Sequence, residues 1–390
     1  MSCTAIISCN NRVGAAPAQQ EIELTTAAQN YIKTFLSNEG KSNYPITAMT
    51  LTMSCNATVS GTATAGTMGV NNPNPVPLNA LFRIGSITKS FVSVIILNLA
   101  DEGKLSLDDT IGKYFPQYPE WSNITVRQML NMTSGLQDDD GILGQLPISA
   151  FDSYIDPVTQ ILNPLSTMNL LFPSGNGWSY SNPDYILLAL LVEQITGQPF
   201  ETSLTKYITG PNKLNLTNTF FVRNLPSQTV NPNLVVNNLC FDCFNHQPEV
   251  DWTNKTLSFD FGAGNILSTS QDISKYVYGL FTPGVLLSNK EFQQLTTWYS
   301  LQNGQQVNGP TATASTVFGL GVSAIYLSNN HQFLYQFTGV EPGYYVFSYA
   351  VDPDTNHAVS FAINGYPANV AYLNIFIGNV LDSLGTICQQ

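Results

Sequence analysis

Hydrophobic residues near the start of the chain recur at helical spacing, and two strand-like runs follow them. Between Glu21 and Asn38 the apolar side chains fall three to four positions apart, and Gly40 ends the run, so we expect an amphipathic helix. Residues 46–55 and 60–70 are rich in Thr and Met and are separated by a short polar turn. This pattern predicts a β-hairpin directly after the helix.

The middle of the chain has helical patterns and no run of alternating strands. After a loop rich in Pro and Asn, an apolar helix is expected from Ser86 to about Ala100, closed by Gly103. From residue 105 to residue 309, short helical patterns alternate with loops rich in Pro, Gly and Asn. We expect this stretch to form a mainly helical lobe.

The last part of the chain returns to strand patterns. Four runs joined by polar turns predict strands, and a helical pattern follows them: the strands are expected at 317–327, 332–338, 344–351 and 357–363, and the helix at 368–384. Strands at both ends with helical material between them predict an α+β fold. Its antiparallel sheet is assembled from both ends of the chain and flanked by the N- and C-terminal helices.

The predicted arrangement divides the chain into two lobes. Residues 21–104 and 310–390 are expected to form the lobe with the sheet, and residues 105–309 the inserted helical lobe. One core stops growing at about 250–300 residues, so a chain of 390 agrees with two lobes. Residues 1–20 lack the basic start and the apolar stretch of a signal peptide, and we expect them to be a flexible tail.

The charge balance and the hydropathy exclude two kinds of partner. The 14 Lys and Arg residues against 26 Asp and Glu give a net charge of −12, without one basic run. Binding to a nucleic-acid backbone requires clustered cations, so no nucleic-acid partner is expected. No apolar run approaches the ~18 residues of a membrane span, so no membrane-spanning segment is expected. The sequence gives no indication of oligomeric state.

Six cysteines and several Asn-x-Thr motifs indicate where the protein works. Cys240 and Cys243 form a single C-x-x-C with only His246 nearby, which favours a local disulfide over a zinc or redox site. Few Lys residues, many Asn, Thr and Ser residues and five Asn-x-Thr motifs agree with export. We therefore expect a secreted or periplasmic protein. No H-E-x-x-H, complete phosphate loop or G-x-S-x-G occurs, and we expect no metal and no cofactor.

Candidate chemistry lies at the start of the apolar helix, in Ser86-Ile-Thr-Lys89. Three residues make nearly one helical turn, so the hydroxyl and the amine share a face. A lysine desolvated among apolar groups can accept the proton of a serine, which activates the hydroxyl as a nucleophile. The motif alone is also explained by a helix N-cap beside an exposed lysine. A second copy, from Ser203 to Lys206, we interpret as a solvated helix face.

Two further motifs follow the first in order along the chain. The set Ser86-x-x-Lys89, Tyr180-x-Asn182 and Phe337-Thr-Gly resembles the β-lactamase-like serine hydrolases, which include class C β-lactamases, D-alanyl-D-alanine peptidases and related esterases. With tyrosine as its first residue, the middle motif resembles that of the class C members of the family. The resemblance spans about residues 21–384 and implies a β-lactamase/transpeptidase-like fold with an acyl-enzyme mechanism.

The resemblance also implies catalytic roles. Ser86 would be the acylated nucleophile, and Lys89 its proton acceptor or the cation that holds Tyr180 as a phenolate. Tyr180 would relay the proton to the leaving group. Asn182 would hydrogen-bond Lys89 and the substrate. A phenol loses its proton near pH ~10 without help, so Tyr180 depends on a nearby Lys89.

The third motif is expected to bind the substrate. By the same resemblance, the backbone N–H groups of Ser86 and Val340 would form an oxyanion hole, and the strand with Phe337, Thr338 and Gly339 would wall the cleft. Phe337 departs from the family pattern, which has Lys or His before Thr-Gly. An aromatic ring cannot bind a carboxylate as a full charge does, which favours an ester or neutral amide substrate unless Arg83 or His331 supplies the charge. Phe337 is equally well interpreted as a residue that packs on its strand neighbours and not as one that contacts the substrate.

Three functions follow from these observations. The first is an exported serine hydrolase that cleaves an ester or amide bond in a small-molecule or peptide-like substrate. A β-lactamase or D-alanyl-D-alanine carboxypeptidase is the alternative within this class. The second is a binding protein that has kept the fold and lost turnover, and the third is a redox protein that uses the C-x-x-C cysteines. The complete set of catalytic motif residues favours the first.

Overall fold

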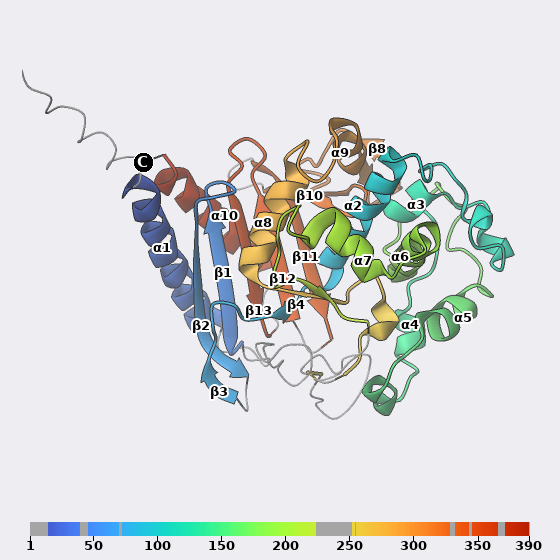
Figure 1. The fold of residues 1–390 in the computed structure, drawn as a ribbon, viewed down its shortest axis with the longest axis horizontal. Coiled ribbons are helices and arrows are strands. Elements are labelled where there is room, and N and C mark those ends of the chain that lie inside the picture. The colour runs from blue at the N-terminus through green and yellow to red at the C-terminus, as the bar shows by residue number, and fades with distance from the viewer. Residues whose placement is uncertain are drawn as a thin grey trace, which may run out of the picture.

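A ten-stranded antiparallel sheet forms the centre of the molecule (Figure 1). The computed structural model describes residues 15–39, 46–69, 72–223, 252–253, 255–327, 332–342, 345–365 and 371–389. The strand order is β3-β2-β1-β13-β12-β11-β10-β9-β7-β8. The strands are β1 (Ala48–Ser54), β2 (Ser60–Gly69), β3 (Asn72–Pro75), β7 (Trp298–Ser300), β8 (Gln306–Val307), β9 (Thr316–Phe318), β10 (Ser323–Leu327), β11 (Gln332–Glu341), β12 (Tyr345–Val351) and β13 (Ala358–Ile363).

Both ends of the sequence contribute to this sheet. The predicted hairpin is present as β1 and β2, and β1 pairs with β13 from Met49 opposite Ile363 to Ser54 opposite Ala358. The predictions of an α+β fold and of a sheet built from both chain ends are therefore confirmed.

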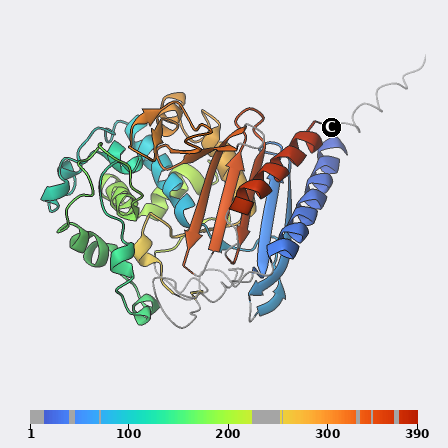
Figure 2. The same cartoon turned by 180° about the vertical axis from the view of Figure 1, so that it is seen from behind.

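Helices α1 (Ala15–Glu39) and α10 (Ala371–Ile387) cover one face of the sheet (Figure 2). The apolar stripe of α1 is fully buried against β1 and β2 and consists of Leu24, Ala28, Ile32 and Phe35. Burial of each large side chain in this stripe contributes about 1.5–3 kcal/mol. The stripe thus explains why the N-terminal helix docks on the sheet.

The opposite face of the sheet packs on α8 (Ser270–Phe281) (Figure 1). Successive side chains of a strand point to opposite faces of the sheet. Along β1, apolar side chains accordingly alternate with side chains that have a hydroxyl group. The hydroxyl of Thr50 lies 2.7 Å from that of Ser270, and the hydroxyl of Ser54 lies 2.6 Å from that of Ser274. Hydroxyl groups of α8 thus provide hydrogen-bond partners for the buried hydroxyl groups of β1.

The helical lobe packs around α2 (Thr88–Asp101), which follows a 3₁₀ turn at Gly85–Ile87. Eleven of the 14 residues of α2 are buried, as expected for a helix enclosed on all sides. The other helices are α3 (Val126–Leu130), α4 (Asp140–Leu143), α5 (Asn163–Leu165), α6 (Asn182–Thr196), α7 (Phe200–Leu204) and α9 (Asn289–Leu295). A small sheet, of order β4-β6-β5, joins β4 (Phe82–Arg83), β6 (Ile266–Ser268) and β5 (Phe220–Phe221).

Two predicted boundaries of regular structure were wrong. The N-terminal helix begins at Ala15, so residues 15–20, expected in a tail, are helical. The run 317–327 is not one strand but the hairpin of β9 and β10. The turn between them contains Gly321 with φ +78°, a conformation that glycine adopts readily and that ends the strand inside an apolar run.

The inserted helical lobe is also shorter than expected. Helix α8, predicted inside the lobe of residues 105–309, packs on β1 and β13, and β7 and β8 extend the large sheet. The chain therefore returns to the sheet by residue 270 and not at residue 310. Local periodicity identifies a helix but not the core against which it packs, which accounts for the error.

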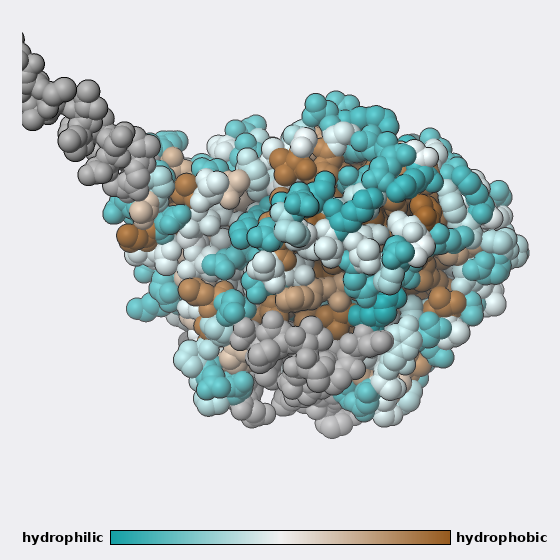
Figure 3. Space-filling view, in the orientation of Figure 1, coloured by the Kyte–Doolittle hydropathy of each residue, from teal (hydrophilic) through white to brown (hydrophobic). Residues whose placement is uncertain are grey.

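A disulfide joins Cys55, just after β1, to Cys388, just after α10, with 5.5 Å between the Cα atoms. The predicted disulfide between Cys240 and Cys243 lies outside the described residues. None of the described helices is long and apolar enough to cross a membrane. The face shown in Figure 3 is mostly hydrophilic or intermediate in hydropathy, with apolar residues in separate patches.

Candidate active site

A cavity of about 520 Å³ opens where β11, the turn before α2 and the helical lobe meet. Its described lining residues come from both lobes: Ser86, Asp138, Asp140, Leu143, Tyr180, Asn182, Phe259, Asp260, Phe337, Thr338, Val340, Glu341 and Pro342. Six of the eight site residues expected from the sequence are among them. The other two lie directly behind the wall: Lys89 hydrogen-bonds Ser86, and Gly339 lies against the turn that carries Ser86.

Two glycines allow β11 to approach the turn that carries Ser86. Gly85 has φ +52°, and a Cβ there would lie 2.8 Å from the backbone N of Val340. A Cβ at Gly339 would lie 2.8 Å from the backbone N of Ser86. Both contacts are too short for a side chain, so glycine is required on each side. The backbone N atoms of Ser86 and Val340 are thus brought close to one another, as an oxyanion hole requires.

Lys89 lies in the first turn of α2 and is fully buried. Its ammonium donates to Ser86 Oγ at 3.1 Å, to Asn182 Oδ1 at 2.7 Å and to the carbonyl of Ala263 at 2.9 Å. An ammonium has three donors, and each has an acceptor here. The position of the amine beside the serine is therefore fixed from three directions.

Tyr180 completes the group around the serine hydroxyl. Its OH donates to Ser86 Oγ at 2.5 Å, and Lys89 Nζ lies 4.8 Å from the centre of its ring. Burial raises the pKa of Tyr180, and Lys89 only partly offsets this effect. Burial alone would lower the pKa of Lys89, but Tyr180 and the carboxylates of Asp260 and Asp138 outweigh it and raise the pKa.

The directions of the two pKa shifts define the resting protonation state of the Lys89–Tyr180 pair. With both pKa values raised, Lys89 is an ammonium and Tyr180 a neutral phenol at neutral pH. Both donate to Ser86 Oγ, so one proton must leave the pair before the pair can accept the proton of Ser86.

Asn182 is oriented by two aspartates that the sequence analysis missed. Asp139 Oδ1 accepts from the side-chain amide of Asn182 at 3.1 Å, and Asp138 Oδ1 accepts from its backbone N–H at 2.9 Å. The amide nitrogen therefore faces Asp139 and the amide oxygen faces Lys89. The run of three aspartates at 138–140 was the available signal, but sequence alone does not place it beside Tyr180-x-Asn182.

The turn that holds Lys89 from behind is itself fixed by side chains. Gly262 N–H donates to Asn265 Oδ1 at 3.3 Å, and Asn265 Nδ2 donates to the carbonyl of Val222 at 3.0 Å. Ala263, whose carbonyl accepts from Lys89, lies within this turn. The position of Lys89 thus depends on the segment that ends at residue 223.

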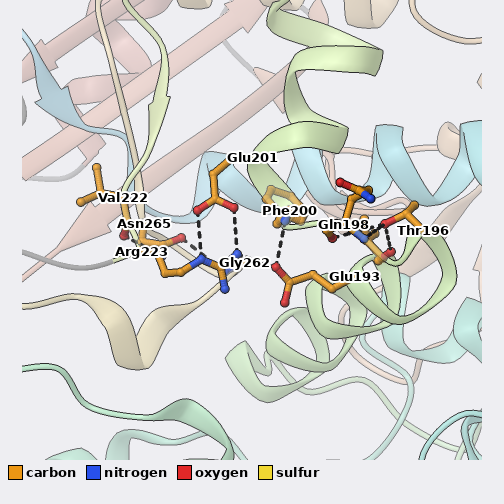
Figure 4. A network of polar contacts seen from close by, with 10 residues as sticks. Glu193, Thr196, Gln198, Phe200, Glu201, Val222, Arg223, Gly262 and Asn265 are labelled. Carbon is orange, nitrogen blue, oxygen red and sulfur yellow. Dashed lines mark hydrogen bonds and ion pairs between the residues drawn. The ribbon is translucent and has the colours of Figure 1, made fainter.

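An ion-pair network anchors that segment to α6 and α7 (Figure 4). Arg223 donates to both carboxylate oxygens of Glu201, at 2.9 and 2.8 Å, and to Glu193. Bidentate contacts of this kind combine charge with fixed geometry. The network holds residues 222–223 against the Gly262–Asn265 turn and supports the site from outside.

Asp260 and Glu341 form a carboxyl pair at the floor of the cavity. Both are buried, at 7% and 3% exposed, and their side chains hydrogen-bond one another. Burial raises the pKa of Glu341 to about 7 and raises that of Asp260 well above its ordinary value. A hydrogen bond between two carboxyls requires a proton, which the pair shares.

Phe337 packs on its strand neighbours and also lines the cavity. It is 8% exposed, and its ring meets that of Phe318 edge to face, with 5.8 Å between centroids. The hydroxyl of Thr338 lies 2.8 Å from that of Ser348 on β12. Phe337 therefore packs as a strand residue, and its place in the cavity wall leaves contact with a substrate as a prediction.

Arg83 does not replace the missing cation. It is 1% exposed and donates to the backbone carbonyls of Thr253 and Lys255, at 3.2 and 2.9 Å. His331, the other candidate, lies outside the described residues. No Lys, Arg or His is among the described residues that line the cavity.

The second S-x-x-K motif has another environment. Lys206 is 56% exposed in its side chain and pairs with Glu102 at 3.5 Å, as a solvated face predicts. Ser203, however, is 3% exposed, so the prediction was wrong for the serine. The two members do not meet in a cavity among the described residues, unlike Ser86 and Lys89.

The carboxylates of Asp138, Asp139 and Asp140 are the described group with the spacing of metal ligands, with oxygens within 4.8 Å of one another. One oxygen of Asp138 and one of Asp139 already accept from Asn182. These contacts assign the group to positioning of Asn182, and we assign no metal to it.

Comparisons with known proteins identify the architecture. The family model described as Beta-lactamase matches residues 51–381. Penicillin-binding protein 4* of Bacillus subtilis (strain 168) is 26% identical over 240 residues, which are 60% of this chain and 52% of that protein. The chain thus spans about half the length of this curated relative.

Solved structures share the fold at low identity. D-amino acid amidase from Ochrobactrum anthropi SV3, complexed with D-phenylalanine, has a TM-score of 0.75 at 22% identity and covers 92% of this chain and 99% of its own. A class C beta-lactamase has a TM-score of 0.70 at 18% identity, with 93% and 97% covered. The β-lactamase/transpeptidase-like fold predicted from the motifs is confirmed.

Proposed function

Because the chain belongs to the beta-lactamase family, we propose that it is a serine hydrolase that cleaves an ester or amide through an acyl-enzyme on Ser86. The observation that carries the proposal is the convergence of three groups on the cavity wall. Lys89 Nζ and Tyr180 OH lie 3.1 and 2.5 Å from Ser86 Oγ, each within hydrogen-bond reach for proton transfer.

The acylation step follows from this geometry. After the Lys89–Tyr180 pair has lost a proton, it accepts the proton of Ser86 as Ser86 Oγ bonds to the carbonyl carbon. The backbone N–H groups of Ser86 and Val340 stabilise the oxyanion, where each donor is worth ~10²–10³ in rate. The bond to the leaving group breaks as Tyr180 protonates it. Water then attacks the carbonyl carbon of the ester as the pair takes a proton from it. The bond between Ser86 Oγ and the acyl carbon breaks, the pair returns that proton to Ser86, and the carboxylic acid leaves.

Labelling with a fluorophosphonate tests the assignment of the nucleophile. The wild-type protein is expected to be labelled, Ser86→Ala to lose the label, and Ser203→Ala to keep it. Ser203 is a matched control because it begins the other S-x-x-K motif. Equal labelling of wild type and Ser86→Ala would reject the proposal and favour a binding protein that has lost turnover.

We propose that the substrate is not selected by a carboxylate. Phe337 occupies the position at which the family has a cation, and the described lining residues include no Lys, Arg or His. A short-chain nitrophenyl ester is therefore expected to react with a higher kcat/KM than a chromogenic cephalosporin or an acyl-D-Ala-D-Ala peptide. A clear preference for either of the last two would instead favour a β-lactamase or a carboxypeptidase.

We also propose a secreted or periplasmic location. The Cys55–Cys388 disulfide supports it, since such bonds persist in oxidising compartments. In fractionated cells of the source organism, the protein is expected in the medium or the periplasmic fraction with this disulfide oxidised. Recovery of the reduced protein from the cytosol would contradict the proposal.

A further inference from the structure

The oxyanion hole and the buried lysine are held by segments that are distant in the sequence. Val340, whose backbone N–H faces the serine turn, lies on β11. The carbonyl that accepts from Lys89 at 2.9 Å belongs to Ala263, in the turn before β6. Acyl transfer needs both segments at fixed positions, since a misplacement of about 1 Å can cost ~10²-fold in rate. A contact that joins them would therefore affect catalysis.

The hydrogen bond between Asp260 and Glu341 is a contact of this kind. Glu341 directly follows Val340 at the end of β11. The side chain of Glu341 is buried at 3% exposed, whereas Val340 is 44% exposed. The end of the strand that provides the oxyanion N–H is thus anchored in the protein interior by the side chain of Glu341.

On the other side of the hydrogen bond, Asp260 is fixed to the turn that holds Lys89. The backbone carbonyl of Asp260 accepts from the N–H groups of Ala263 and Gly264, at 2.9 and 3.0 Å. A shift of Asp260 therefore moves the residue whose carbonyl accepts from Lys89.

Gly264 leaves room for the two carboxyls to meet on this turn. A Cβ at Gly264 would lie 1.9 Å from Asp260 Oδ2 and 2.2 Å from Glu341 Oε1. The two oxygens thus occupy the space that a side chain at this position would fill. Any residue larger than glycine would displace the carboxyls, because a packed interior has no room for the added atoms.

We propose that Asp260 and Glu341 are positioning residues, whose hydrogen bond couples the oxyanion strand to the turn that holds the lysine. The shared proton joins the side chain next to the Val340 N–H to the segment that carries the Ala263 carbonyl. This inference rests on the proposed function, because it takes the serine beside Lys89 as the nucleophile. It gives the two buried acids a role that requires no contact with the substrate.

The charge of the pair is a second way in which it would act on the site. Lys89 and Asp138 influence Asp260 electrostatically. Arg83 and Lys89 influence Glu341. A test of positioning must therefore change the hydrogen bond and the charge separately.

Amide substitutions separate the two effects. The wild-type pair shares one proton and has one negative charge. Glu341→Gln and Asp260→Asn each leave one carboxylate, which accepts from the new amide N–H, so both the charge and the hydrogen bond are kept. Glu341→Met removes the hydrogen bond with a side chain of similar length. Gly264→Ala forces the carboxyls apart with both acids present.

The rate at which a fluorophosphonate labels Ser86 at saturating concentration tests the inference. At pH 6, below the pKa of about 7 of Glu341, the wild-type pair keeps its proton. We expect Glu341→Met to lower the saturating rate by ~10²-fold, with little change in the concentration that gives half this rate. Glu341→Gln and Asp260→Asn should stay close to wild type. Gly264→Ala should lower the saturating rate as Glu341→Met does, which keeps the inference testable if Glu341→Met does not fold.

Glu291→Met is the matched control. Glu291 lies on α9, is 2% exposed and is not among the described residues that line the cavity. Its replacement removes a buried glutamate at a distance from the site, so the labelling rate should remain that of wild type.

Two failures are distinguishable. If Ser86 of the wild-type protein is not labelled, the proposed function falls. If Ser86 is labelled but Glu341→Met and Gly264→Ala react at the wild-type rate, the hydrolase proposal stands and the positioning role is wrong. A loss in Glu341→Gln as large as that in Glu341→Met would also reject the positioning role, because the hydrogen bond is kept in the amide.

Discussion

Glu341→Gln should change how the stability of the protein depends on pH. Burial raises the pKa of Glu341 to about 7, from an ordinary value of 4.5. Between these two values the folded protein keeps a proton that the unfolded chain has lost. The stability that this group contributes is therefore fully present below pH 4.5 and is lost as the pH rises through 7.

The size of the effect follows from the interval between the two pKa values. At ~1.36 kcal/mol for each pH unit, the interval from 4.5 to about 7 corresponds to about 3 kcal/mol. Glutamine has the shape of the acid and does not titrate. The free energy of unfolding of Glu341→Gln relative to wild type should thus increase by about 3 kcal/mol between pH 4.5 and pH 8.

Urea denaturation of wild type and Glu341→Gln at pH 4.5, 6 and 8 measures this difference. Glu120→Gln is the control, because it removes an exposed carboxylate outside the cavity and should track wild type. A wild-type to Glu341→Gln difference that stays constant from pH 4.5 to 8 would refute the raised pKa and the shared proton at the floor of the cavity.

Four other outcomes are expected. Tyr180→Phe should lower kcat/KM by ~10²–10⁴-fold, the usual worth of a positioned proton donor, while circular dichroism remains that of wild type; a near-normal rate would assign the proton transfer elsewhere. The rate of acylation should increase with pH above neutrality, since the raised pKa values of Lys89 and Tyr180 keep both protonated at pH 7, and a flat profile would contradict this resting state. Phe337→Lys should improve kcat/KM for a substrate with a carboxylate about tenfold, with Phe337→Leu as the control for loss of the ring; no gain over Leu would show that the missing cation does not set specificity. Cys55→Ser should lower the free energy of unfolding by about 2–5 kcal/mol, and unchanged stability would show that the disulfide does not hold α10 on the sheet.

Much of the fold was predictable because its signals are local. Alternating and helical periodicities identified β1, β2 and the strands β11 to β13, and the order of the motifs placed Ser86 and Tyr180 in one site. The split of residues 317–327 was missed because Gly321 interrupts an otherwise continuous apolar run. Helix α8 was placed in the wrong lobe because an apolar stripe does not say which surface will cover it.

The environment of the site depends on contacts between distant segments. Asp260 and Glu341 lie in different elements, and only the folded chain brings their carboxyls together beneath the cavity. The pairing of Cys55 with Cys388 could not be predicted from the sequence either, since six cysteines allow 15 connectivities when all are paired. The sequence therefore identified the reacting groups, whereas the charge of the surrounding wall required the structure.

The most direct measurement of the central claim is the position of the acyl group in a trapped intermediate. The protein would be mixed with a nitrophenyl ester, quenched in acid within the first turnover, digested and analysed by mass spectrometry. We predict an acylated peptide with the modification on Ser86 and a burst of nitrophenol of about one equivalent, as an acyl-enzyme produces. An acyl group on a different residue, or steady hydrolysis without any acylated peptide in the quenched samples, would contradict the account.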